Sequence, residues 1–285
     1  MAGTSKTKNI IKRLTAALFV ILTLAITYLP LPVTWDDIYA AVGLYSQKIN
    51  NQELLDLTVT YIDVGQGDSI LIHTDRTNIL IDTGPKGNGQ NIYQTLKALK
   101  IEKLDYLIIT HQHDDHNGSL NEIRKLIPID QEIIPTNETK MVGITQAIDD
   151  ITLEFLGPVY ISDDLNNMSL VIKLTYKNVS FLFMGDAGSE EEANLIRTYD
   201  ASTLKSDVLK VGHHGSDSSS SQAFINVVQP SYAVISVGAD NDYGHPHEAT
   251  LNTLKQTNTQ VFRTDRDGTV ICTTDGEKIV FHRLE

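Results

Sequence analysis

Three histidines and two aspartates stand within six consecutive positions of the chain. Segment 111–116 reads His-Gln-His-Asp-Asp-His and follows the apolar, strand-like segment 106–110. A strand that ends in such a cluster delivers its side chains to the carboxyl edge of a sheet, where ligands bind in layered α/β proteins. Imidazole and carboxylate groups suit zinc, manganese or iron. A solvated polar loop is the alternative, but a loop without a role gains nothing from a cluster that collects metal. The segment therefore predicts a metal site.

Further polar side chains stand where other predicted strands end. They are Asp82 after 79–81, Asp186 after 181–185, His213 and His214 after 208–212, and His245 after 235–238. A carboxylate that follows a buried strand costs free energy unless it is paired or bound to a metal. For Asp186 the alternative is a cap on the helix that follows. These residues are the candidates for completing the site.

The pattern of apolar residues predicts strands that alternate with helices. Strands are expected at 57–64, 68–73, 78–82, 105–110, 151–156, 169–176, 180–184, 207–211, 232–237, 260–263, 269–273 and 279–282. Helices are expected at 91–99, 189–199 with Ser189 as N-cap, 221–228 and 248–256. This order predicts an α/β fold with two sheets between helical layers.

The composition of the chain excludes several classes of protein. With 285 residues and 41% hydrophobic content, the chain can bury one large core. A net charge of −13 argues against a stable complex with nucleic acid on a broad basic surface. Bound divalent cations would still attract phosphate to an acidic cleft. The single cysteine, Cys272, excludes an internal disulfide and a cysteine-rich zinc site.

The amino terminus differs from the rest of the chain. Residues 1–13 are basic, and residues 14–32 form an apolar segment whose length lies between a signal-peptide core and a short membrane span. The basic flank predicts that everything after this segment lies outside the cytoplasm. We favour an uncleaved membrane anchor over a removed signal peptide, followed by a linker at 33–56 and a globular domain at 57–285.

With these residues in view, the chain resembles the metallo-β-lactamase superfamily from about 57 to 282. His111-x-His113-x-Asp115-His116 matches the superfamily's central motif, Asp82 its first motif, and Asp186 the acidic residue that bridges two metals. The resemblance implies a four-layer αββα sandwich and a metal-dependent hydrolase.

Four further segments resemble the nuclease-like domain of ComEC-type DNA-uptake proteins. They are 63–69, 81–85, 209–216 and 243–247. That branch also includes phosphorylcholine-esterase-like enzymes. Asn166 and Asn167 stand where the superfamily usually has a histidine, and an oxygen ligand there would shift the preference from zinc towards manganese.

The resemblance implies a centre with two divalent ions, Zn or Mn. His111 and His113 would hold one ion, and Asp115, His116 and one histidine of the pair His213–His214, preferably His214, the other. Asp186 would bridge the ions, which would turn a shared water into hydroxide. Asp82 would orient a ligand, while Asp63, Asn166 and Asn167 would support a ligand or touch substrate. His245 would hold a substrate oxyanion or protonate the leaving group, unless 245–247 is only a helix-entry turn.

The resulting prediction is an extracytoplasmic hydrolase of phosphodiester bonds in DNA, a nucleotide or a phosphorylated surface component. Asp115, Asp186 and His245 are its expected catalytic residues. One alternative is a hydrolase of a lactone, thioester or β-lactam, because one scaffold hosts all these activities. Another is a non-catalytic surface module stabilised by metal. The sequence leaves the oligomeric state open.

Overall fold

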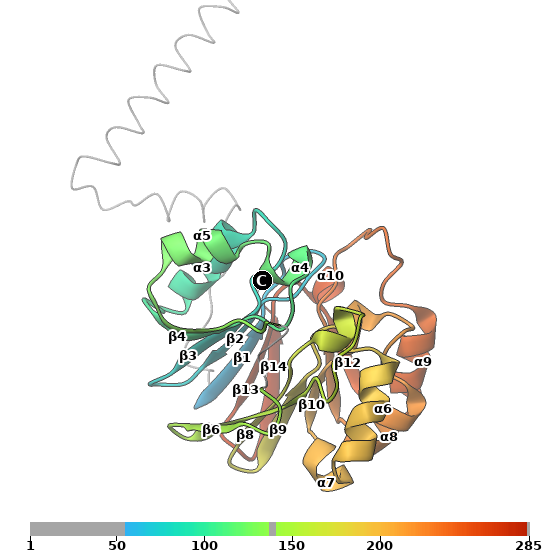
Figure 1. Cartoon of the computed structure of the whole chain (residues 1–285). Helices are drawn as coiled ribbons and strands as arrows, with labels where there is room; N and C mark the ends of the chain where they lie inside the picture. The colour runs from blue at the N-terminus through green and yellow to red at the C-terminus, as the bar shows by residue number, and fades with distance from the viewer. Residues whose placement is uncertain (1–54, 137–140, 284–285) are drawn as a thin grey trace, which may run out of the picture. The chain divides into compact units, whose positions relative to one another are not determined.

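Two seven-stranded sheets form the core of the part that the computed structural model describes, residues 55–136 and 141–283 (Figure 1). The first has the order β14-β13-β1-β2-β3-β4-β5, with β1 (Leu57–Tyr61), β2 (Ile70–His73), β3 (Asn78–Ile81), β4 (Leu104–Ile108), β5 (Ile129–Ile133), β13 (Val270–Thr274) and β14 (Ile279–Arg283). The second has the order β12-β11-β10-β9-β8-β7-β6, with β6 (Thr145–Ile148), β7 (Ile151–Gly157), β8 (Val171–Tyr176), β9 (Val179–Phe183), β10 (Val208–Lys210), β11 (Tyr232–Ile235) and β12 (Gln260–Arg263).

Helices cover the outer face of each sheet (Figure 1). On the first sheet lie α3 (Gly89–Ala98) and α5 (Leu120–Leu126), and on the second α6 (Ser189–Thr198), α7 (Ala201–Leu204), α8 (Gln222–Val228) and α9 (Glu248–Gln256). Short turns complete the described chain: α4 (Asp114–Asn117), η1 (Asn166–Met168), η2 (Gly212–Gly215) and α10 (Thr264–Asp267). The fold is therefore the predicted four-layer αββα sandwich.

The period-two alternation of the strands builds the layers. In β3, Ile79 and Ile81 point into the core between the sheets, while Leu80 packs beneath α3. In β9, Phe181 and Phe183 face that same core, and Leu182 packs under the helices of the second sheet. Both faces of these strands are buried, which explains their continuous apolar sequences.

Strand direction determines where the polar clusters meet. Strands β3, β4 and β5 run parallel in the first sheet, as do β9, β10, β11 and β12 in the second. Parallel strands place their carboxyl ends at one edge of a sheet, where ligands bind. Residue Asp82 follows β3, His111 follows β4, Asp186 follows β9, and the histidine pair follows β10.

The helices α6 and α8 begin with different N-caps. Ser189 is the first residue of α6 and not its N-cap, which is Gly188; Asn167 Oδ1 accepts the N–H of Gly188 and stabilises this helix start instead. Asp186 does not cap the helix either. Ser221 does cap α8, since its Oγ accepts the N–H of Phe224 at 3.3 Å.

The expected anchor at 14–32 lies outside the described residues, as does nearly all of the expected linker. Within the described residues, no helix combines the length and the apolar composition that a membrane crossing requires.

Candidate metal centre

Two groups of imidazoles and carboxylates that contain Asp186 meet at the edge where the strands end, beside a third group made of Asp68, Asp82 and His116. One contains His111, His113 and Asp186, and the other contains Asp115, His116, Asp186 and His214. Within each group the nitrogen and oxygen atoms lie within 4.8 Å of one another. Asp186 belongs to both groups, so its carboxylate lies between two sets of donor atoms.

The first group forms on the loop after β4. His111 is 2% exposed, and its Nε2 lies 3.0 Å from His113 Nδ1 and 3.8 Å from Asp186 Oδ2. Its Nδ1 lies 3.2 Å from Ser169 Oγ, the same hydroxyl that accepts the N–H of Asp186. Burial, and after it the charge of His116, lower the pKa of His111 to about 3. A neutral imidazole is the form that binds metal.

The second group lies deeper. His116 Nε2 is 3.1 Å from Asp186 Oδ1, and His214 Nε2 is 3.4 Å from the same oxygen and 3.3 Å from Asp115 Oδ2. The two Nε2 atoms are 3.4 Å apart. Despite these short distances, Asp186 Oδ1 is buried and accepts no hydrogen bond of good geometry. Because a buried carboxylate oxygen is costly without a partner, a cation among these atoms fits the donor set.

Asp82 supports the second group from behind. Its backbone adopts φ +60°, a left-handed conformation that is strained for an aspartate. One carboxylate oxygen accepts the N–H of Thr110, and the other lies 2.7 Å from Thr110 Oγ1 and 2.8 Å from His116 Nδ1. This contact fixes the His116 ring with Nε2 facing Asp186, which is how carboxylates orient metal-bound histidines.

We expect Asp82→Asn to weaken metal binding about 10- to 100-fold, the usual cost of losing such an orienting partner. The single oxygen of an amide cannot accept both the N–H of Thr110 and the Nδ1–H of His116, so the ring loses its fixed orientation. Isothermal titration with zinc measures the effect. The matched control is Asp105→Asn, because Asp105 also accepts a backbone N–H, that of Asn78, but at the opposite end of β4. Equal zinc affinity in wild type and Asp82→Asn would contradict this role.

The two adjacent histidines of η2 have different surroundings. His213, His214 and Gly215 adopt φ of +47°, +52° and +83° in succession. Non-glycine residues in this region cost roughly 1–3 kcal/mol each and concentrate at functional sites. The turn aims His214 into the second group, where its Nδ1 lies 3.0 Å from the carbonyl oxygen of Ser236. His213 Nε2 is 3.9 Å from Asp186 Oδ2, and this ring is partly exposed.

A buried ion pair, whose two residues are not among the predicted site residues, lies behind His214. Asp68 Oδ1 is 3.4 Å from His214 Nδ1, and Asp68 Oδ2 is 2.8 Å from Lys210 Nζ. Lys210 is 0% exposed and also donates to the carbonyl of Val211. Burial alone would raise the pKa of Asp68, but Lys210 and His214 lower it well below its usual range. Asp68 therefore lies behind His214 as its charge partner, while the carbonyl oxygen of Ser236 accepts the hydrogen bond of Nδ1.

Two of the predicted supporting residues have other contacts. Asp63 Oδ1 accepts the N–H of Gly65 and shapes the turn before β2, so Asp68 is the aspartate of this motif that reaches the centre. Asn167 donates to Glu190 and accepts the N–H of Gly188, which directs its side chain to the start of α6.

An open pocket of about 510 Å³ gives access to the centre, a size typical of ligand sites. It is lined by Gln66, Pro85, His113, Asp114, Asp115, Asn166, His213, His214, Tyr243 and His245. Asn166 Oδ1 and His245 Nδ1 are buried without hydrogen-bond partners. The segment 245–247 also leads into α9, where His247 is the N-cap and Pro246 precedes it.

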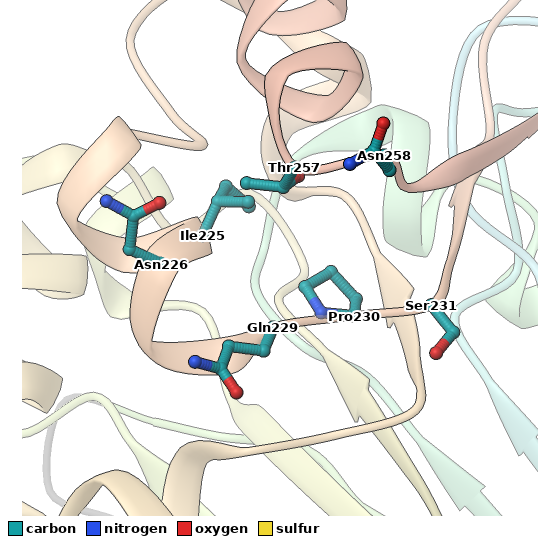
Figure 2. A pocket seen from close by; sticks show the side chains of 7 residues that line it. All are labelled: Ile225, Asn226, Gln229, Pro230, Ser231, Thr257 and Asn258. Atoms are coloured by element: carbon teal, nitrogen blue, oxygen red, sulfur yellow. The ribbon is translucent and has the colours of Figure 1, made fainter.

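A second hollow, of about 600 Å³, lies at the other edge of the second sheet (Figure 2). The ends of α8 and α9 and the start of β11 form it, and none of its lining residues carries an ionisable side chain. It is lined by Ile225, Asn226, Gln229, Pro230, Ser231, Thr257 and Asn258. The first pocket differs from this hollow because aspartate and histidine side chains line it.

Metal affinity is expected to rise with pH between 6 and 8. Burial opposes protonation of His116 and His214, yet Asp186 and the neighbouring carboxylates raise the pKa of both well above the ordinary histidine value. Metal must displace these protons, so binding releases about two protons and weakens about a hundredfold for each unit of acidification. Calorimetric titration in two buffers of different ionisation enthalpy counts the protons. A zinc affinity that is constant over this range would contradict the expectation.

The fold and the two donor groups that share Asp186 are those of a metallo-hydrolase. The family model for the metallo-beta-lactamase superfamily matches residues 62–239, and the chain belongs to this superfamily. Among curated proteins it is similar to ComE operon protein 3 of Bacillus subtilis (strain 168), with 32% identity over 74% of this chain and 32% of the relative. It is also similar to competence protein ComA of Neisseria gonorrhoeae, with 34% identity over 75% of this chain and 32% of the relative. The predicted resemblance to competence proteins is thus confirmed, and the chain spans about a third of the length of these two relatives.

Proposed function

We propose that the protein hydrolyses phosphodiester bonds with two divalent ions, zinc or manganese, at the centre described above. The observation that carries this proposal is the position of Asp186, whose two carboxylate oxygens face different groups of donor atoms. His111 and His113 would hold the first ion, with Asn166 Oδ1 available as an oxygen donor, because it is buried without a partner and lines the same pocket. Asp115, His116 and His214 would hold the second. When bound, such ions supply an activated water and stabilise charge on the phosphate.

The side chains around the ions have separate tasks. Asp82 holds His116 by its Nδ1 atom, and the carbonyl oxygen of Ser236 holds His214 by its Nδ1 atom with Asp68 3.4 Å away, so each ring presents Nε2 to the centre. Asp115 lies at the pocket wall and is the carboxylate best placed to orient the attacking water. These contacts preorganise the site before substrate binds, which is where electrostatic catalysis has its largest effect.

His245 is assigned to holding a substrate oxygen. Burial, and after it the nearby His213 and His214, lower its pKa to about 4, so the ring is neutral at pH 7. A neutral imidazole donates one hydrogen bond, and its unpartnered Nδ1 lies in the pocket wall. Two roles were expected for His245: holding a substrate oxyanion or protonating the leaving group. A group with so low a pKa rarely carries a proton to give, which favours the first role.

The similarity to competence proteins supports DNA or a nucleotide as the substrate class. The basic and then apolar sequence of residues 1–32 supports a catalytic domain outside the cytoplasm, held by an anchor. The net charge of −13 favours short or transiently bound substrates over long DNA held on a basic surface.

The test is hydrolysis of bis-(p-nitrophenyl) phosphate and of a single-stranded oligonucleotide by the purified protein, with zinc or manganese and with chelator. We expect activity that requires metal and is lost in His113→Ala. The matched control is His73→Ala, because His73 pairs with Asn78 at the other end of β3. Activity that survives His113→Ala, or turnover of a lactone, thioester or β-lactam in place of both phosphodiesters, would overturn the proposal. A folded protein that binds no metal would do so as well.

A further inference from the structure

Tyr243 is an exposed aromatic residue at the mouth of the metal pocket. Its side chain is 66% exposed, and it lines the pocket together with His113, Asp115 and His214. Single exposed hydrophobic residues are common on protein surfaces and carry little meaning alone. The position of this one, on the wall of a pocket that leads to a candidate active site, is the first observation that points to a ligand.

The second observation is the arrangement of rings behind Tyr243. Its ring stacks on His245 with centroids 5.6 Å apart and an interplanar angle of 24°. His245 in turn stacks on His214 with centroids 6.4 Å apart and an angle of 28°. The three rings form a series of near-parallel planes that runs from the donor atoms of the centre to the solvent. A planar group bound beside the centre would continue this stack.

The third observation is that hydrogen bonds of the Asn241 side chain fix the loop 238–245, which carries Tyr243. Asn241 donates to the carbonyl oxygens of Gly238 and His245 at 2.9 and 2.7 Å. Its side-chain oxygen accepts the N–H groups of Tyr243 and His245 at 3.2 and 3.0 Å. Four hydrogen bonds from one side chain fix both ends of the segment that carries the ring. An aromatic platform that is already ordered loses little conformational entropy when a ligand binds.

The fourth observation is the charge of the pocket. Among its described lining residues there is no lysine or arginine, whereas Asp114 and Asp115 are acidic. Substrate phosphates would therefore meet the cations of the centre and the neutral ring of His245, but no positively charged side chain. The remainder of a nucleotide needs a contact that does not depend on positive side chains, and stacking on an aromatic ring supplies one for any base.

We propose that Tyr243 is the stacking platform for the nucleobase next to the scissile phosphate, so that the substrate is a single-stranded or single nucleotide unit. This inference rests on the proposed function. A quaternary ammonium headgroup, the other ligand class that aromatic residues recognise, is enclosed by a cage of several rings. Here one ring offers one open face above a parallel stack, which suits a flat base.

The test compares two ligands on the manganese-loaded full-length protein by calorimetry: thymidine 5′-monophosphate, and 2-deoxyribose 5-phosphate, which lacks only the base. We expect the wild type to bind the nucleotide about tenfold more tightly than the sugar phosphate, within the range for one stacked base. Tyr243→Ala should bind both ligands equally, and Tyr243→Phe should keep the wild-type preference. Tyr160→Ala is the matched control, because Tyr160 is 61% exposed and is not among the residues that line the pocket; it should also keep the preference.

Equal affinities of the wild type for the two ligands, or a preference that persists in Tyr243→Ala, would overturn the stacking inference. Phosphocholine binding that is lost in Tyr243→Ala, without any nucleotide preference, would replace the base by a cationic headgroup. These outcomes are separable from failure of the proposed function, which is a failure of the metal-loaded wild type to hydrolyse bis-(p-nitrophenyl) phosphate. Binding of the two monophosphates is measured whether or not that hydrolysis occurs.

Discussion

Asp186→Asn is expected to lower the hydrolytic rate about a thousandfold or more, because metal ions supply several kcal/mol of transition-state stabilisation. Asp186 is 1% exposed and stands in both donor groups. Burial alone would raise its pKa, but His116 and His214 lower it well below the ordinary aspartate value, so it is ionised at neutral pH. Asparagine keeps the size of the side chain but offers one oxygen and no charge. It therefore cannot attract two cations.

Metal analysis of the purified variant checks this prediction together with the rate. We expect fewer than two ions per chain, with a circular dichroism spectrum like that of the wild type. Asp207→Asn is the matched control, since Asp207 also accepts bonds from neighbouring groups, the N–H and Oγ of Ser180, but lies before β10 at the opposite edge. Two tightly bound ions or near-wild-type turnover in Asp186→Asn would rule out the bridging role.

Lys210→Met is expected to lower the free energy of unfolding by about 3–5 kcal/mol, because breaking a buried ion pair leaves an uncompensated charge. Asp68 is 1% exposed, and the charge that holds it ionised comes from Lys210 at 2.8 Å. The pair also joins the two sheets, since Asp68 precedes β2 and Lys210 ends β10. Methionine matches the length of the lysine stem but leaves the carboxylate without its partner.

Urea unfolding of the metal-free protein measures this effect without a contribution from metal binding. Lys173→Met is the matched control: Lys173 is also buried, but it donates only to the carbonyl oxygens of Thr203 and Lys205. The double variant Asp68→Asn/Lys210→Met should be less unstable than the sum of its single changes. A loss below about 1 kcal/mol in Lys210→Met, or strict additivity, would show that the pair is not coupled.

The sequence was most informative where strands are buried on both faces. The apolar run in β9 and the alternation in β1 and β2 predicted their strands within a few residues, and the helix at 248–256 was predicted with its observed bounds. Strands β5 and β6 were missed because exposed residues interrupt their apolar pattern, whereas the other two edge strands, β12 and β14, were predicted. In β5 the residues Asp130, Gln131 and Glu132 are exposed, so the segment lacks the apolar pattern on which prediction depends.

In the candidate site, the residues that are neighbours in sequence were predicted, whereas a residue that depends on the packing of distant strands was not. His111, His113, Asp115 and His116 are neighbours in sequence, and their residue types alone indicated metal. Asp68 was not singled out although it stands in the same motif as Asp63, because only the pairing of β1 with β2 and the approach of β10 decide which aspartate reaches His214.

Lys210 shows that one charged residue in an apolar strand can indicate a buried ion pair. A lysine between Leu209 and Val211, in a strand that is otherwise fully buried, breaks the apolar pattern. A buried cation must be paired, so this residue was a signal for an unseen carboxylate. The sequence does not identify that carboxylate, because the partners are 142 positions apart, from Asp68 to Lys210, and only the packing of the two sheets brings them together.

The central claim is that Asp186 lies between two metal ions. The most direct measurement is anomalous diffraction from crystals grown with zinc or manganese, recorded on both sides of the absorption edge of the metal. We expect two peaks about 3.5–4 Å apart, the usual spacing of two-metal sites. One should lie beside His111 and His113 and the other beside Asp115, His116 and His214, with the Asp186 carboxylate between them. A single peak that Asp186 does not touch, or no peak at this edge of the sheets, would contradict this claim.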